Sequence, residues 1–232
     1  MQQLLLDLAP LPAASLDNFA VGRNAEPLRA LRAWLAGDGE RVLYLWGPPG
    51  SGKTHLLRGA AASPRRGAQA VLLAASELDE DDRRIQVGRH FAIDDVQSAS
   101  PAGQAALFTL LNRAAQGELN LLVAGAIAPA GLGVREDVRT RLAAALVLQL
   151  HPLDDEDKER ALQSHARSRG FDLPAEAARH LLQHGRRDLR WLLIVLDALD
   201  RYSLQTRRPI SLALAREVLH AARAGPAASA EE

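Results

Sequence analysis

The chain has 232 residues, enough for one large domain or for a core with a small satellite domain, and its 47% hydrophobic content can fill a real core. Lysine plus arginine and aspartate plus glutamate balance at 28 each, so no global basic field argues for nucleic-acid binding. The lack of cysteine excludes disulfides and thiolate metal sites; without a secretion signal or a run of about 18 apolar residues, the sequence predicts a cytoplasmic protein with no membrane span.

The first 14 residues form a short, leucine-rich segment that ends in prolines. Leucines in such a segment are costly to expose to water, so they either pack on the protein's own core or bind another protein. In an extended peptide Leu4, Leu6 and Leu8 point to one side and can fill one hydrophobic groove. Gln3 offers an amide for a polar contact at the edge of that groove.

A turn-rich segment over residues 15–24 precedes a predicted helix, which carries Leu28, Leu31 and Leu35 on one face. The glycine-rich residues 37–39 end that helix. An apolar run rich in strand formers then predicts the first strand at about residues 42–46.

The stretch after this strand matches the phosphate-loop pattern G-x-x-x-x-G-K-[ST] at every fixed position. The glycines let backbone N–H groups close around phosphate oxygens, and the following helix adds a partial positive charge at its start. Lys53 is predicted to reach the β- and γ-phosphates, and the Thr54 hydroxyl to help hold Mg²⁺. The eight matching residues are Gly47, Pro48, Pro49, Gly50, Ser51, Gly52, Lys53 and Thr54.

Two carboxylates close the third predicted strand. A second strand is predicted at residues 70–74, and the acidic run from 77 to 82 is predicted to be a solvated loop or a helix start. The third strand then ends in Asp94 and Asp95, the Walker B pattern, in which Asp94 holds Mg²⁺ through water and Asp95 lies where a carboxylate can activate water. The alternative is an aspartate pair that caps the next helix, but the preceding phosphate loop favours the functional interpretation.

Strands and helices continue to alternate. A helix is predicted at about residues 102–116, a fourth strand at 120–125 and a fifth at 146–150. This alternation predicts a five-stranded parallel sheet with helices on both faces. Since ligands bind at the carboxyl ends of such strands, Gly47, Asp94 and Gly125 are expected to converge on one crevice.

From Pro152 onward the pattern predicts helices and no strand. Asp154 can cap a first helix that Gly170 ends, and Pro174 opens a second. A third helix carries a continuous leucine stripe, and a short fourth helix follows it. The expected parts are a binding peptide, an α/β nucleotide-binding domain, a small helical lid domain and a disordered tail, at residues 1–14, 15–151, 152–223 and 224–232.

A phosphate-loop α/β domain followed by a small helical bundle resembles an AAA+ module. Residues 15–24 look like the segment that opens the ATPase domain of the bacterial replication initiator DnaA, where it borders the adenine. Three later runs resemble the lid of the DnaA-related regulatory inactivator family, Hda: residues 152–158, 169–174 and 187–190. The resemblance covers about residues 3–220.

The resemblance also assigns roles to single residues. Arg141 falls on the arginine finger, with Arg139 as the near alternative, and a finger supplies positive charge to a neighbour's γ-phosphate. Arg190 matches the sensor-2 arginine, which touches nucleotide from the lid side. The residues implied to contact ADP or ATP are Asn18, Phe19, Val21, Gly47, Pro48, Gly50, Ser51, Gly52, Lys53, Thr54, His55 and Arg190.

Two departures from related proteins matter. Those proteins usually carry a polar residue after the fourth strand that reads the γ-phosphate, whereas residues 124–129 here have no polar side chain. Intrinsic ATP hydrolysis is therefore expected to be weak or absent. The chain also ends after the lid, where DnaA continues into a helix-turn-helix domain, so no sequence-specific DNA binding is expected.

The resemblance implies a negative regulator of chromosomal replication initiation. Bound to adenine nucleotide and to the DNA polymerase III β sliding clamp, it would present Arg141 to ATP on DnaA, and hydrolysis there would leave inactive ADP–DnaA. For clamp binding, Gln3, Leu4, Leu6 and Leu8 resemble the Gln-Leu-x-Leu-x-Leu peptide of bacterial replication proteins.

Two other functions stay open. A helicase-loader-like ATPase would hydrolyse its own ATP through Lys53, Asp94 and Asp95. An AAA+ adaptor would instead localise DnaA at a membrane or on DNA, and the neutral charge weighs against it. The sequence leaves open whether ADP or ATP is the working ligand and whether the protein forms a homo-oligomer.

Overall fold

The computed structural model describes residues 13–63, 70–79, 85 and 89–224. The chain divides into two compact units, one of residues 14–152 and one that contains residues 153–224. Each unit is described by itself. The predicted peptide of Gln3, Leu4, Leu6 and Leu8, part of the acidic run and residues 225–232 of the predicted tail lie outside the described residues. The first residue of that predicted tail, Ala224, is instead the last residue of a helix.

The first unit is built on a five-stranded sheet in the order β2-β3-β4-β1-β5. Every pair of neighbouring strands is parallel, which confirms the predicted parallel sheet. The carboxyl ends of all strands therefore lie along one edge of the sheet. The strands are β1 (Val42–Trp46), β2 (Val71–Ala74), β3 (His90–Asp94), β4 (Asn120–Gly125) and β5 (Leu146–Gln149).

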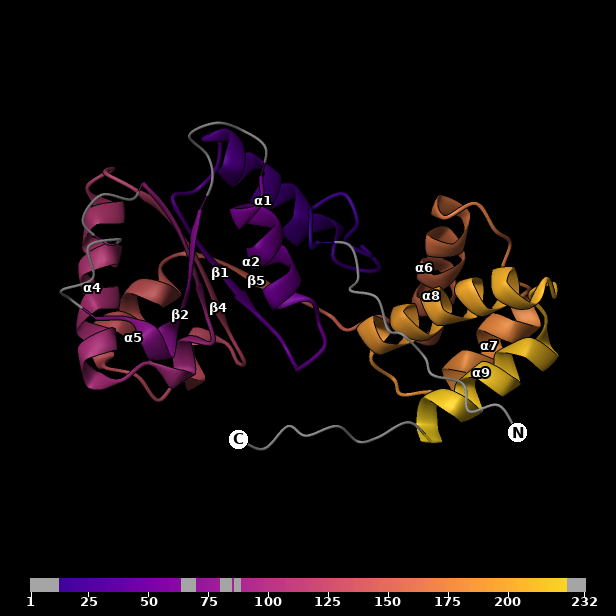
Figure 1. Ribbon diagram of the computed structural model, residues 1–232. Helices are drawn as coiled ribbons and strands as arrows, with labels where there is room; N and C mark the ends of the chain where they lie inside the picture. Colours follow the sequence, from indigo (N-terminus) through magenta and orange to yellow (C-terminus); the bar gives the residue numbers. More distant parts are fainter. Residues whose placement is uncertain (1–12, 64–69, 80–84, 86–88, 225–232) are drawn as a thin grey trace. The chain divides into compact units, whose positions relative to one another are not determined.

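Helices cover both faces of this sheet (Figure 1). Helices α1 (Ala25–Ala36) and α2 (Lys53–Ala61) pack on one face, and α4 (Pro101–Ala115) and α5 (Glu136–Ala143) pack on the other. Alternate residues of each strand point to opposite faces, so Leu43 and Leu45 join the core under α1 and α2 while Tyr44 joins the core under α4.

Local signals explain where these elements begin and end. The predicted leucine face of α1 is buried, and the helix ends at Gly37, whose left-handed φ of 80° lets its N–H reach the last carbonyls. At the start of α4, Ser100 accepts a hydrogen bond from Gly103 N and Pro101 occupies the first turn. The described part of the first unit also contains three short 3₁₀ turns: η1 (Ala75–Glu77), η2 (Val96–Ser98) and η3 (Pro129–Gly131).

In its described part the second unit consists of four helices around one apolar core. Asp154 caps the first of them by accepting from Asp157 N, as predicted, and Gly170 follows its end with a φ of 86°. The helices are α6 (Asp155–Ser168), α7 (Ala175–His184), α8 (Leu189–Thr206) and α9 (Leu212–Ala224). None of the described helices combines the length and hydrophobicity that a membrane crossing requires.

Candidate functional site

The phosphate loop joins the end of β1 to the start of α2 at the carboxyl edge of the sheet. Gly50 and Gly52 adopt φ values of 78° and 96°, which glycine tolerates better than any other residue. A side chain at Gly47 is excluded because a Cβ there would lie 2.3 Å from the Leu150 carbonyl oxygen. Ser51 is buried, and its hydroxyl has no hydrogen-bond partner within the described part of the chain. The loop thus has the backbone shape and a free polar atom that a phosphate group needs.

Lys53 lies folded over this loop. Its ammonium group donates to the carbonyl oxygens of Gly47 at 2.7 Å and Pro48 at 3.1 Å. Burial lowers the pKa of Lys53, and the negative charges of Asp95 and then Asp94 act in the opposite direction. A phosphate in the loop would offer the ammonium a charged partner in place of two neutral carbonyls.

The two predicted Walker B carboxylates lie beside the loop, and their hydrogen bonds differ. Asp94 ends β3, and its Oδ2 accepts a hydrogen bond from the Thr54 hydroxyl at 2.7 Å. Asp95 follows with a positive φ of 53°, and its backbone N–H donates to Asp94 Oδ1 at 3.0 Å. The structure therefore brings the predicted pair Thr54 and Asp94 together. No cluster of three histidine, aspartate or glutamate side chains suited to a metal ion occurs among the described residues.

Gln97, at the same edge of the sheet, is a residue that sequence reasoning missed. Its side-chain Nε2 donates to Asp95 Oδ1 at 3.2 Å, and its Oε1 accepts from the backbone N–H of Ala126 at 3.2 Å. It therefore links the end of β3 to the residue that follows β4. Its spacing from Asp95 matches no motif, so only the convergence of the strand ends could have pointed to it.

The Tyr44 side chain occupies the space that a side chain at Gly125, the last residue of β4, would need. It is fully buried, and its hydroxyl donates to the Ile127 carbonyl at 2.7 Å. Burial raises the pKa of Tyr44, so the hydroxyl stays protonated as a donor. A Cβ at Gly125 would lie 2.1 Å from this hydroxyl. The absence of a polar side chain at Gly125 thus has a steric cause.

The opening segment lies against the phosphate loop, where the resemblance places the adenine. A Cβ on Gly52 would lie 2.7 Å from the Phe19 ring, and that ring lies 5.6 Å from the ring of His55. His55 Nε2 lies 3.0 Å from the Ser15 carbonyl, which requires the nitrogen to be the donor, and burial lowers the pKa of His55. Asn18 exchanges two hydrogen bonds with Ser15.

Other residues anchor or flank this segment. Val21 packs against the core under α1 and α2. Asn24, a second residue that sequence reasoning missed, is buried and exchanges two hydrogen bonds of 2.8 Å with the backbone of His151. Arg190 lies in the first turn of α8 in the second unit, where it is exposed. Its predicted contact with nucleotide stays a prediction.

The two arginine-finger candidates lie on α5 and have different surroundings. Arg139 is ion-paired with Glu136, whereas no carboxylate of the described residues pairs with Arg141. The Arg141 guanidinium lies instead over the Phe108 ring, 5.0 Å from its centre. Its side chain is exposed and available to an external anion.

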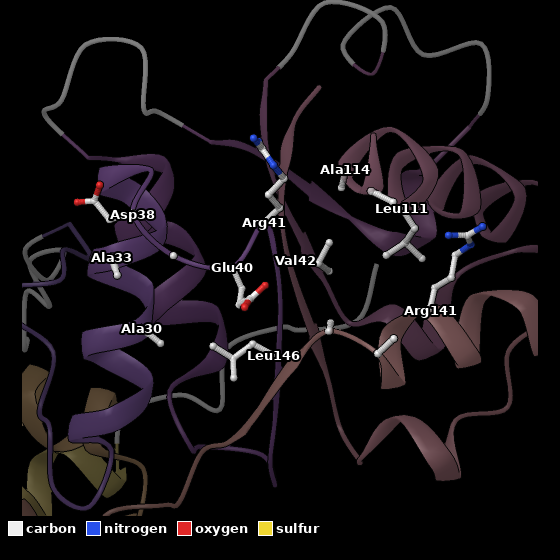
Figure 2. A pocket seen from close by; sticks show the side chains of 14 residues that line it. Ala30, Ala33, Asp38, Glu40, Arg41, Val42, Leu111, Ala114, Arg141 and Leu146 are labelled. Carbon is white, nitrogen blue, oxygen red and sulfur yellow. The ribbon is translucent and has the colours of Figure 1, made fainter. Parts of the chain in front are cut away.

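Arg141 also lines an open cavity of about 790 Å³ (Figure 2). The residues that line this cavity include Val42 and Leu146, the first residues of β1 and β5. It therefore lies at the amino edge of the sheet, opposite the phosphate loop. Arg41 and Glu40, from the loop before β1, also line this cavity and are labelled in Figure 2.

Comparisons with known proteins decide the family. Residues 155–219 match the family model described as Hda, lid domain. An uncharacterized protein from Haemophilus influenzae is 33% identical over 228 residues, which is 94% of this chain and 99% of that protein. The chain belongs to the Hda family of DnaA-related AAA+ replication regulators.

Solved structures show the same fold as this Hda-family protein. Domain III of the Thermotoga maritima replication initiation protein DnaA matches with a TM-score of 0.73 and 21% identity, over 90% of this chain and 98% of that chain. DnaA from Aquifex aeolicus, solved with AMPPCP bound, matches with a TM-score of 0.68 and 20% identity, over 87% and 71%. The Thermotoga maritima RuvB Holliday junction branch migration motor matches with a TM-score of 0.68 and 18% identity, over 89% and 71%.

Proposed function

We propose that this Hda-family protein is a negative regulator of replication initiation that stimulates the hydrolysis of ATP bound to DnaA. The observation that carries the proposal is the state of Arg141, which is exposed, has no carboxylate partner among the described residues, and lies at the sheet edge opposite its own phosphate loop. A guanidinium in this state is available to the γ-phosphate of a nucleotide held by another protein.

The protein's own crevice would hold an adenine nucleotide. The glycine geometry of the loop, the unpartnered Ser51 hydroxyl and the start of α2 suit the phosphates, and Lys53 would turn from the loop carbonyls to them. The Aquifex aeolicus DnaA with the same fold binds AMPPCP, which supports adenine as the base. We expect ADP to bind at least as well as ATP, because no polar side chain follows β4 to read a third phosphate.

Mg²⁺ would accompany the nucleotide. Thr54 and Asp94 are already within hydrogen-bond distance of each other and both present oxygen atoms, the ligands that Mg²⁺ prefers. Thr54 and Asp94 would hold the ion directly or through water, which is the usual arrangement when phosphates supply the remaining ligands. The ion would neutralise phosphate charge. Asp95 lies next to this pair and donates its backbone N–H to Asp94 Oδ1.

Arg141 would act as the arginine finger on DnaA. Its guanidinium would stabilise the charge that develops on the transferred phosphoryl group, an effect on the order of a thousandfold or more in rate. Arg139 is less suited, because reaching an external phosphate would break its ion pair with Glu136. Clamp binding by Gln3, Leu4, Leu6 and Leu8 rests on the sequence pattern and would concentrate the protein where DNA is being copied.

The proposal is tested by measuring hydrolysis of ATP bound to purified DnaA, with and without this protein, the sliding clamp and DNA. We expect stimulation by the unmodified protein and by Arg139→Ala, and loss of stimulation with Arg141→Ala. Normal stimulation by Arg141→Ala together with loss by Arg139→Ala would transfer the role to Arg139. If both variants stimulate hydrolysis normally, the finger mechanism is wrong. If the protein hydrolyses ATP without DnaA, and single-stranded DNA stimulates this activity, a helicase-loader-like ATPase is favoured instead.

A further inference from the structure

The side chain of Gln97 makes two hydrogen bonds at the carboxyl edge of the sheet, one with Asp95 and one with Ala126. The N–H of Ala126 can only donate, so the atom facing it at 3.2 Å must be the amide oxygen of Gln97. The amide nitrogen of Gln97 then faces Asp95 Oδ1 at 3.2 Å, and a carboxylate is the acceptor that such a donor requires. Both contacts are chemically matched, so the orientation of the amide is fixed by its partners.

The first contact removes a donor from the crevice. Residues 124–129, at and after the end of β4, offer no polar side chain that could bind a third phosphate. A backbone N–H could take that place, because backbone N–H groups bind phosphate oxygens well. At Ala126 this N–H already donates to Gln97.

The second contact holds a negative charge beside the phosphate loop. Asp95 follows Asp94, the last residue of β3, and its Oδ1 accepts from Gln97 Nε2 at 3.2 Å. Gln97 thus fixes the Asp95 carboxylate at the carboxyl edge of the sheet, the edge at which the phosphate loop also lies. A γ-phosphate entering here meets a like charge, whereas a diphosphate ends before it.

We propose that Gln97 sets the preference of this nucleotide site for a nucleoside diphosphate over a nucleoside triphosphate, by accepting from the Ala126 N–H and by fixing the Asp95 carboxylate at the same edge of the sheet. This rests on the proposed nucleotide site and adds to it the residue that discriminates between its ligands. In related proteins, a polar residue after β4 contacts the third phosphate. Gln97 has the opposite effect, because it accepts from the Ala126 N–H and so withholds a donor from that phosphate.

The test compares the dissociation constants of ADP and of the non-hydrolysable analogue AMPPCP, both with Mg²⁺, by calorimetry on the full chain. Gln97→Ala frees the Ala126 N–H and releases Asp95, so we expect the affinity ratio to move about threefold to tenfold towards AMPPCP. Gln97→Glu keeps an acceptor for Ala126. It loses the donor to Asp95 but places a second carboxylate beside it, and this added negative charge opposes a third phosphate, so the ratio is expected to stay at the unmodified value or move towards ADP. If Gln97 had only a structural role, both substitutions would shift the affinity ratio in the same direction.

Gln104 provides the matched control. It also bridges two elements, with Oε1 accepting from Arg135 N at 2.8 Å and Nε2 donating to the Ala99 carbonyl at 3.1 Å. Gln104→Ala is expected to leave the ratio unchanged. If the unmodified protein binds neither nucleotide, the proposed site itself fails. If it binds both but favours AMPPCP, or Gln97→Ala leaves the ratio within twofold, or both Gln97 variants move it towards AMPPCP, only the role of Gln97 is overturned.

Discussion

The end of β4 has no room for a side chain because the Tyr44 hydroxyl fills the space. A Cβ at Gly125 would lie 2.1 Å from that hydroxyl and 3.0 Å from Val96 Cγ1. The hydroxyl cannot retreat freely, since Tyr44 is fully buried and donates to the Ile127 carbonyl at 2.7 Å. We therefore predict that Gly125→Ala destabilises the first unit and that Tyr44→Phe relieves much of this cost.

The contacts set the size of the effect. Overpacking a filled core costs about 1–3 kcal/mol, and a 2.1 Å contact places Gly125→Ala in the upper half of that range. Tyr44→Phe alone removes one hydrogen bond and leaves the Ile127 carbonyl without its donor, which costs about 1–2 kcal/mol. In the double variant the nearest remaining atoms are the ring carbon and Val96 Cγ1, each at 3.0 Å, and shifts of a few tenths of an ångström relieve such contacts. The two changes should thus couple favourably by about 1 kcal/mol or more.

Urea unfolding of the unmodified protein, both single variants and the double variant measures this coupling. Gly133→Ala is the matched control, because a Cβ there would meet no atom within 4 Å. It should therefore leave the free energy of unfolding nearly unchanged. Costs of Gly125→Ala and Tyr44→Phe that add to within about 0.5 kcal/mol would refute the claim that the hydroxyl is what excludes a side chain.

Three further predictions use simpler assays. Lys53→Ala should abolish adenine-nucleotide binding in calorimetry, and equal affinity would contradict the phosphate site. Burial lowers the pKa of His55 below 6.5, so the unfolded chain takes up the proton first and the free energy of unfolding should fall as the pH drops below about 6.5; His55→Gln should flatten that part of the profile. Replacing Gln3, Leu4 and Leu6 by alanine should abolish clamp binding with little change in melting temperature, whereas a large drop would assign these leucines to the protein's own core.

Features set by local sequence could be predicted. The glycines and Lys53 of the phosphate loop stand at fixed spacing between a strand and a helix, and Asp94 ends an apolar run, so both signals lie within a few residues. The parallel sheet follows from the alternation of strands and helices, because parallel neighbours need a crossover between them.

The bridges between distant segments could not be predicted. Gln97 meets Ala126 across 29 residues, Tyr44 meets Ile127 across 83, and Asn24 meets His151 across 127. No spacing in the sequence encodes such pairs, since they depend on which strands become neighbours. The sequence did reveal that the end of β4 lacks a polar side chain, but the reason, the hydroxyl of a tyrosine in β1, depends on the pairing of β1 with β4.

The phosphate loop and Arg141 lie at opposite edges of the parallel sheet. The phosphate loop follows the last residue of β1, while Arg141 lines a cavity with Val42, the first residue of that strand. Five residues of parallel strand span roughly 16 Å, beyond the reach of an arginine side chain back to its own crevice. A role for Arg141 in hydrolysis therefore requires a nucleotide on a second molecule. It follows that Arg141→Ala should leave the protein's own nucleotide affinity unchanged, and a loss of that affinity would show that the two edges are not independent.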